Sequence, residues 1–154
     1  MVQLTTHSAQ ETFQAGYKLG NILKKGDVVC LTGGLGTGKT AFTGGIASAL
    51  GIEGYITSPT FTIVNEYEGK TPLYHFDVYR IADPSEMFEI GFEEYVEGNG
   101  IVVIEWAELI RDILPAAYIN IVIEKDFNAG SDIRKLSFQF IGDRYGQYEG
   151  RLEL

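Results

Sequence analysis

The stretch Leu31-Thr-Gly-Gly-Leu-Gly-Thr-Gly-Lys-Thr40 constrains this chain more than any other part of its sequence. It fits the Walker A pattern, in which Gly33 and four further residues precede Gly38, Lys39 and Thr40. Because glycine has no Cβ, the backbone N–H groups of such a loop can converge on phosphate oxygens. The alternative is an ordinary glycine-rich turn, but an apolar strand before the loop and a helix after it favour phosphate binding.

The flanking residues predict how the loop would act. The run 27–31 is typical of a buried strand, and residues 39–50 predict a helix whose positive dipole end faces the phosphates. Lys39 can reach the β- and γ-phosphates, and the Thr40 hydroxyl can ligate Mg²⁺. We expect the phosphates of a nucleotide to be bound by Gly33, Gly34, Leu35, Gly36, Thr37, Gly38, Lys39, Thr40 and Ala41.

Strands and helices alternate along the rest of the chain. Ser8 and Glu11 form a capping box for an N-terminal helix, and the pair Gly44-Gly45 either weakens the helix 39–50 or permits close packing on the sheet. A hairpin is expected from two β-rich runs, 60–67 and 72–79. The other predicted elements are a helix starting at 83–86, a strand over 100–105, a helix over 107–114, and strands over 118–124 and 134–141.

This order predicts an α/β fold. Helices around a sheet that carries a glycine loop indicate a three-layer sandwich of the kind found in P-loop nucleoside triphosphatases. The β hairpin makes the central sheet mixed, although mostly parallel. The 154 residues fit one domain, 1–154.

Two acidic residues follow apolar runs. Glu105 ends Ile101-Val-Val-Ile-Glu105, and Asp77 ends Leu73-Tyr-His-Phe-Asp77. A phosphate-loop site needs an acid near its metal, usually at the end of a neighbouring strand. One of the two would hold Mg²⁺ and the other would orient the attacking water, with the assignment left open. Each residue has the alternative role of a charged group facing solvent.

Four hydroxyl residues lie between the glycine loop and these acids, in Thr57-Ser-Pro-Thr-Phe-Thr62. Their segment is either a switch that senses the γ-phosphate, through Ser58, Pro59, Thr60 and Thr62, or a turn capped by hydroxyls. Arg80 is either a phosphate contact or a surface ion pair. His75 lies between two aromatic residues and is expected to be a packed histidine.

Charge and composition exclude some classes of function. The formal net charge is −9, and the 12 basic residues are scattered, which argues against autonomous nucleic-acid binding. No apolar run reaches the roughly 20 residues that cross a bilayer, and no signal peptide is evident. The single cysteine, Cys30, is expected inside a buried strand. These features predict a cytoplasmic protein without a membrane partner.

Taken together, LTGGLGTGKT, SPTFTIVNEY, HFDVYR and IEWAE resemble the bacterial TsaE family in order and approximate spacing. The resemblance is sharpest over residues 27–108. It implies a P-loop ATPase, slow without its partners, that serves the synthesis of N6-threonylcarbamoyladenosine on tRNA. One departure is Gly34, where the family often carries an acidic residue, so any contact made by that acid is lost.

The resemblance also implies residue roles and partners. It places Thr40 and Glu105 at Mg²⁺, Asp77 and Ser58 to Thr60 beside the γ-phosphate of ATP, and Trp106 directly after the metal-binding acid. The expected partners are the TsaB and TsaD subunits of the threonylcarbamoyl-transfer complex, with tRNA reached only through them. Two alternatives remain: a small-molecule kinase with Asp77 as base, and a nucleotide-gated binding module without essential hydrolysis.

Overall fold

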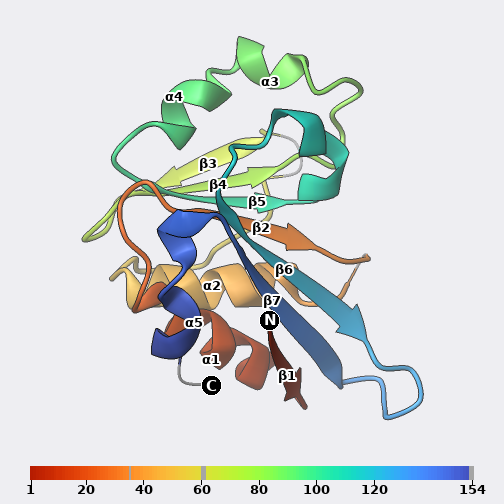
Figure 1. Ribbon diagram of the computed structural model, residues 1–154. Coiled ribbons are helices and arrows are strands. Elements are labelled where there is room, and N and C mark those ends of the chain that lie inside the picture. Colours follow the sequence, from red (N-terminus) through yellow and green to blue (C-terminus); the bar gives the residue numbers. More distant parts are fainter. Residues whose placement is uncertain (35, 60–61, 153–154) are drawn as a thin grey trace.

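The structure, a computed structural model, describes residues 1–34, 36–59 and 62–152. Seven strands form one sheet in the order β1-β7-β6-β2-β5-β4-β3 (Figure 1). Their bounds are β1 Val2–Thr6, β2 Val28–Thr32, β3 Val64–Tyr67, β4 Leu73–Asp77, β5 Ile101–Glu105, β6 Tyr118–Lys125 and β7 Arg134–Ile141.

The sheet is mixed. Its four central strands, β6, β2, β5 and β4, pair in parallel, whereas β3 and the pair β7 and β1 join through antiparallel ladders at the two edges. Five of the seven strands therefore point the same way, and only β3 and β7 are reversed. The α/β class is confirmed, and the parallel character resides in the centre of the sheet.

Helices cover both faces of this sheet (Figure 1). One face carries α1 (Ala9–Gly20) and α2 (Lys39–Ala49), with η2 (Asp143–Tyr145) and α5 (Tyr148–Arg151) beside them; the other carries α3 (Glu86–Glu89), α4 (Phe92–Val96) and η1 (Ala107–Ile113). Alternate residues of β2 enter the two cores, because successive side chains of a strand point to opposite faces. Val29 and Leu31 belong to the first core, and Val28 and the buried Cys30 to the second.

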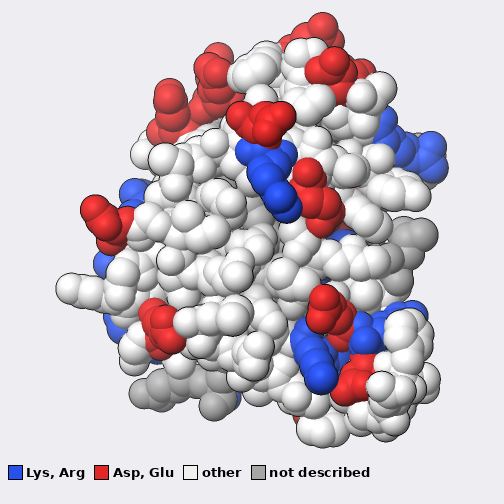
Figure 2. Space-filling model, turned by 45° about the vertical axis from the view of Figure 1, so that its right-hand side comes forward, with Lys and Arg blue, Asp and Glu red and all other residues white. Residues whose placement is uncertain are grey.

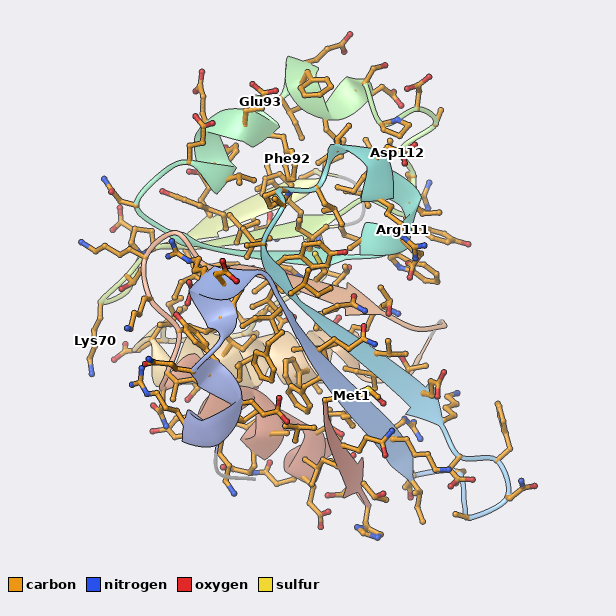
Figure 3. The ribbon with its side chains drawn as sticks, in the orientation of Figure 1. Met1, Lys70, Phe92, Glu93, Arg111 and Asp112 are labelled. Carbon is orange, nitrogen blue, oxygen red and sulfur yellow. The ribbon has the colours of Figure 1, made fainter. Side chains whose placement is uncertain are left out.

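The second face shows how an amphipathic element packs. Figure 3 shows Phe92 of α4 pointing toward the sheet and Glu93 pointing away from it. Phe92 is buried and its ring meets Phe76 of β4 edge to face, with centroids 5.4 Å apart. In Figure 2 acidic side chains gather at the upper end of the molecule, where α3 and α4 lie. An acidic end of this kind repels a phosphate backbone.

Most of the predicted elements form, but several differ in type or bounds. The predicted strand over 72–79 is limited to β4, and the helix expected from 83–86 is the four-residue α3, which begins at Glu86 and is followed by α4. The predicted strand over 60–67 begins only at Val64, because Ile63 has a φ of 70°; residues 60 and 61 lie outside the described part of the chain. The predicted helix over 107–114 is the 3₁₀ helix η1, which is distorted at Ile110. The edge strand β1 and the C-terminal turns η2 and α5 were not predicted.

The capping box holds only in part. The Ser8 hydroxyl accepts a hydrogen bond from the Glu11 amide at 3.1 Å, but the Glu11 carboxylate binds the amide of His7 rather than that of Ser8. The close packing expected of Gly44-Gly45 occurs against α1 and not against the sheet. A Cβ on Gly45 would lie 1.9 Å from the Phe13 carbonyl oxygen.

Within residues 1–34, 36–59 and 62–152, none of the helices has the length and hydrophobicity needed to cross a bilayer.

Candidate functional site

A glycine loop, residues 33–40, connects β2 to α2. Gly33, Gly36 and Gly38 have φ values of 140°, 68° and 108°, which residues with a Cβ rarely adopt. Gly33 also passes so close to β6 that a Cβ would lie 2.2 Å from the Ile123 carbonyl oxygen. The loop is therefore fixed against the sheet at its start, and α2 begins at Lys39 with its N-terminal dipole facing the loop.

A cavity of about 480 Å³ opens over this loop. It brings together segments from four places in the sequence: the loop and the start of α2, the segment before β3, the end of β4, and the end of β5. Its lining consists of Gly36, Thr37, Gly38, Lys39, Thr40, Ala41, Ser58, Asp77, Tyr79, Arg80, Glu105 and Trp106.

Most of the predicted site residues therefore meet in one place. Gly33 and Gly34 belong to the loop but do not line the cavity, and neither do Pro59 and Thr62. Thr62 is exposed, and its hydroxyl donates to the Asn65 side chain at 3.2 Å. Leu35 and Thr60 were also predicted, and both lie outside the described residues.

Lys39 is buried, with its ammonium group turned back onto the loop. Nζ donates to the carbonyl oxygens of Gly33 at 2.9 Å and Gly34 at 2.7 Å. Burial lowers the pKa of Lys39, while the negative charges of Glu105, Glu108 and Asp77 act in the opposite direction. The ammonium is thus placed where it can exchange carbonyl oxygens for the oxygens of an incoming anion.

Asp77 and Glu105 lie side by side because β4 and β5 are parallel and in register at these two residues. Both carboxylates are buried. Asp77 accepts hydrogen bonds from the Ser58 hydroxyl at 2.5 Å and from the Tyr79 amide at 3.0 Å. Since like charges directly opposite each other on a sheet repel, these donors and the nearby Lys39 stabilise the pair.

Trp106 closes the cavity on the side of β5. Its indole ring lies 4.3 Å from the Lys39 ammonium and stacks at a tilt on Tyr79, with centroids 4.7 Å apart. Trp106 has a φ of 64°, and its amide donates to the Leu31 carbonyl oxygen at 3.0 Å. A bulky residue in the left-handed region is strained, and such strain concentrates at functional sites.

Several site contacts were missed by the sequence analysis. The Arg134 Nε, at the start of β7, donates to the Thr37 carbonyl oxygen at 3.0 Å and thereby ties the β6–β7 hairpin to the glycine loop. Glu108 on η1 has a buried carboxylate oxygen with no partner among the described residues, and burial raises its pKa. His75 contacts Glu105. None of these contacts connects neighbours in sequence, so no local pattern predicts them.

The oxygen-bearing side chains in this cavity are of the kind that could ligate a magnesium ion that is also bound by phosphate. No group of three His, Cys, Asp or Glu side chains among the described residues is arranged to hold a metal. Mg²⁺ in phosphate sites takes one or two protein carboxylates and completes its shell with phosphate oxygens and water. A hydroxyl at Thr40 and carboxylates at Asp77 and Glu105 match that requirement.

Comparison with known proteins identifies relatives of the chain. The family model "Threonylcarbamoyl adenosine biosynthesis protein TsaE" matches residues 6–134. The tRNA threonylcarbamoyladenosine biosynthesis protein TsaE of Bacillus subtilis is 50% identical over 123 residues, which cover 79% of this chain and 75% of that protein. The protein of the same name from Treponema pallidum is 45% identical over 120 residues, covering 78% and 89% of the two chains.

A solved structure agrees with these matches. The crystal structure of YdiB from Bacillus subtilis superposes with a TM-score of 0.84 at 38% identity, covering 98% of this chain and 93% of that one. The matching segment contains the glycine loop, both buried acids and Trp106. The chain therefore belongs to the TsaE family of threonylcarbamoyl adenosine biosynthesis proteins.

Proposed function

We propose that this chain is a Mg²⁺-dependent P-loop ATPase that serves the synthesis of N6-threonylcarbamoyladenosine on tRNA. Membership of the TsaE family supports the pathway. The chemistry is supported by one observation above all: the cavity over the glycine loop also contains the two buried acids at the ends of β4 and β5. A phosphate chain on the loop would have its terminal group beside these acids.

Each residue would have a distinct task. The loop amides and the dipole of α2 bind the phosphates, and the Lys39 ammonium leaves the Gly33 and Gly34 carbonyls to bind them as well. Thr40 and Glu105 hold Mg²⁺, which would neutralise charge on the phosphate oxygens. Asp77 accepts a hydrogen bond from the attacking water and so orients it toward the γ-phosphate.

The segment before β3 would couple this chemistry to a partner. Ser58 donates to Asp77, so a change at a phosphate bound beside Asp77 would reach this segment through one hydrogen bond. We propose that ATP orders the segment and that hydrolysis releases it, which drives or resets a complex with TsaB- and TsaD-type subunits. Arg80 and Trp106, at the cavity edge, would contact phosphate or partner. The tRNA would be held by the partners, in keeping with the acidic surface of this chain.

The roles of Thr40 and Glu105 can be tested by alanine substitution. Thr40→Ala and Glu105→Ala should each lower Mg²⁺-dependent phosphate release from ATP by about a hundredfold or more, because metal and charge stabilisation are lost. Thr5→Ala and Glu93→Ala remove the same groups from exposed positions and should retain wild-type turnover. Normal hydrolysis by both site variants would contradict the assignment.

Two further measurements separate this function from its alternatives. A small-molecule kinase needs an acceptor, so phosphate release from ATP in its absence argues against that activity. A nucleotide-gated binding module would support repeated product formation with a non-hydrolysable ATP analogue, whereas an ATPase would not. Both assays should include TsaB- and TsaD-type subunits, because the rate without partners is expected to be low.

A further inference from the structure

His75 contacts one of the two acids, although it does not line the cavity. The His75 Nε2 lies 2.5 Å from Glu105 Oε2, and both side chains are buried, with exposed fractions of 0% and 4%. The sheet register explains the contact. His75 is paired with Val103, two residues before Glu105 on the same face of β5, so the two side chains are diagonal neighbours on adjacent strands.

The surroundings of the imidazole indicate which nitrogen carries a proton. Nδ1 of His75 is buried and has no hydrogen-bond partner among the described residues. A proton on Nδ1 would therefore be a buried donor without an acceptor, which is costly. A proton on Nε2 instead points at a carboxylate oxygen. This environment therefore favours the tautomer in which Nε2 carries the proton and donates it to Glu105.

Glu105 needs such a donor. It lies directly opposite Asp77, and like charges directly opposite each other on adjacent strands are destabilising unless hydrogen-bond donors offset the repulsion. Asp77 is held by Ser58 and by the Tyr79 amide. His75, on the neighbouring strand β4, holds Glu105 in the corresponding way.

We propose that His75 is a positioning residue: its Nε2–H fixes one oxygen of the Glu105 carboxylate and leaves the rest of that group directed at the cavity. The identity of the ligand that Glu105 binds depends on the proposed function, whereas the hydrogen bond between His75 and Glu105 does not depend on it. Outer-shell partners of metal-binding side chains commonly affect metal affinity or activity by about 10- to 100-fold.

Three substitutions distinguish positioning from simple packing. In His75→Gln the amide nitrogen is as many bonds from the backbone as Nε2, so it can donate to Glu105. In His75→Asn the amide nitrogen corresponds to Nδ1 and falls short, and His75→Leu has no donor. Gln and Asn are both polar, so a penalty for burying an amide would affect both variants.

The expected result is a rescue by glutamine alone. His75→Asn and His75→Leu should lower kcat and raise the Mg²⁺ concentration needed for half-maximal binding of a fluorescent ATP analogue, each by about 10- to 100-fold. His75→Gln should stay within about threefold of wild type in both measurements, and ATP affinity without Mg²⁺ should be similar in all four proteins. Equal impairment of the Gln and Leu variants, or wild-type behaviour of the Leu variant, would overturn the proposal.

A second measurement does not depend on ATP hydrolysis. The chain has two histidines, His7 and His75, so a long-range proton–nitrogen NMR spectrum of the imidazoles is assignable with a His7→Gln variant. We expect a proton on Nε2 of His75, and a shift of that signal in Glu105→Leu. An unprotonated Nε2 would overturn the proposal. If the wild-type protein released no phosphate, the proposed function would fail. This spectrum would still show whether His75 donates a hydrogen bond to Glu105.

Discussion

At the level of single residues, Lys39 shows how the glycine loop holds its own lysine. Its ammonium group is satisfied by two carbonyl oxygens of its own loop and by the face of Trp106. These bonds already have an ionised donor, and a phosphate chain would replace their neutral acceptors with anionic ones and so add the attraction between opposite charges. The gain from binding is therefore the difference between two sets of contacts, not the full strength of the new set.

Arg134 supports the same loop from outside the cavity. Its Nε donates to the Thr37 carbonyl oxygen, and its Nη1 donates to the Ser131 and Ile133 carbonyl oxygens. Arg134→Met should weaken binding of a fluorescent ATP analogue about three- to tenfold, or roughly 1 kcal/mol, because the loop loses a fixed contact. Arg151→Met makes the same charge change at an exposed position of α5 and should bind normally. Equal affinities of the two variants would show that the contact is irrelevant to binding.

Residues of the site differ in how well sequence predicts them. Asp77 and Glu105 were predicted because an acid at the end of an apolar strand is a local signal. Arg134 and His75 were not given site roles, since their contacts depend on which strands are neighbours and in which register. Thr37 and Arg134 are far apart in the sequence, and only the folded sheet brings the β6–β7 hairpin to the loop.

At the scale of elements, α1 and α2 approach each other through glycines. A Cβ on Gly45 would lie 1.9 Å from the Phe13 carbonyl oxygen, and one on Gly16 would lie 2.0 Å from the Phe42 carbonyl oxygen. Both obstacles are backbone atoms, which cannot move aside as a flexible side chain can. The two helices must therefore separate if either glycine gains a methyl group.

Gly44 and Gly45 provide a matched pair for testing this contact. Gly45→Ala should lower the free energy of unfolding by about 1–3 kcal/mol through overpacking. Gly44→Ala, whose Cβ would lie at an ordinary 3.5 Å from the Phe13 ring, should raise it by up to about 1 kcal/mol through helix propensity. Urea denaturation of the two variants measures the difference, and a destabilised Gly44 variant beside a neutral Gly45 variant would contradict the packing argument.

Elements were predictable where a continuous or alternating apolar pattern identified them. The buried strands β2 and β5 and the hairpin strands β6 and β7 formed close to their expected bounds. The predicted start of β3 was wrong because Ile63 has a left-handed conformation, which is unusual for a β-branched residue and which no local sequence signal indicates. The edge strand β1, Val-Gln-Leu-Thr-Thr, lacks the continuous apolar run of β2 and β5 and becomes recognisable through its ladder with β7.

At the scale of the whole molecule, a cluster around Asp27 fastens the C-terminal segment to the start of β2. The buried Asp27 carboxylate accepts hydrogen bonds from Arg144 Nε at 2.8 Å and from the Tyr148 hydroxyl at 2.7 Å. The Tyr145 hydroxyl accepts from the Val28 amide, and burial raises the pKa of Tyr145 to about 12. Chain segments more than a hundred residues apart are thus joined by a buried charge.

Tyr148→Phe tests this connection with little change in volume. Removing the hydroxyl leaves Asp27 buried with one donor fewer, so the free energy of unfolding should fall by about 1.5–3 kcal/mol, the range for a hydrogen bond to a charged group. Tyr17→Phe removes a hydroxyl from an exposed ring of α1 and should change stability by less than about 0.5 kcal/mol. Guanidinium unfolding of both variants gives the comparison, and equal midpoints would mean that the Tyr148 hydroxyl contributes nothing to stability.

The strand β2 connects the Asp27 cluster to the glycine loop. This strand has parallel neighbours on both sides, is buried along most of its length, follows the Asp27 cluster at its start and leads into the glycine loop at its end. Core strands of this kind open to solvent only when the whole protein unfolds. If a nucleotide binds over the glycine loop as proposed, the attachment of the loop to β2 should therefore stay in place, and any rearrangement should be confined to the loop and to the segments that contact it.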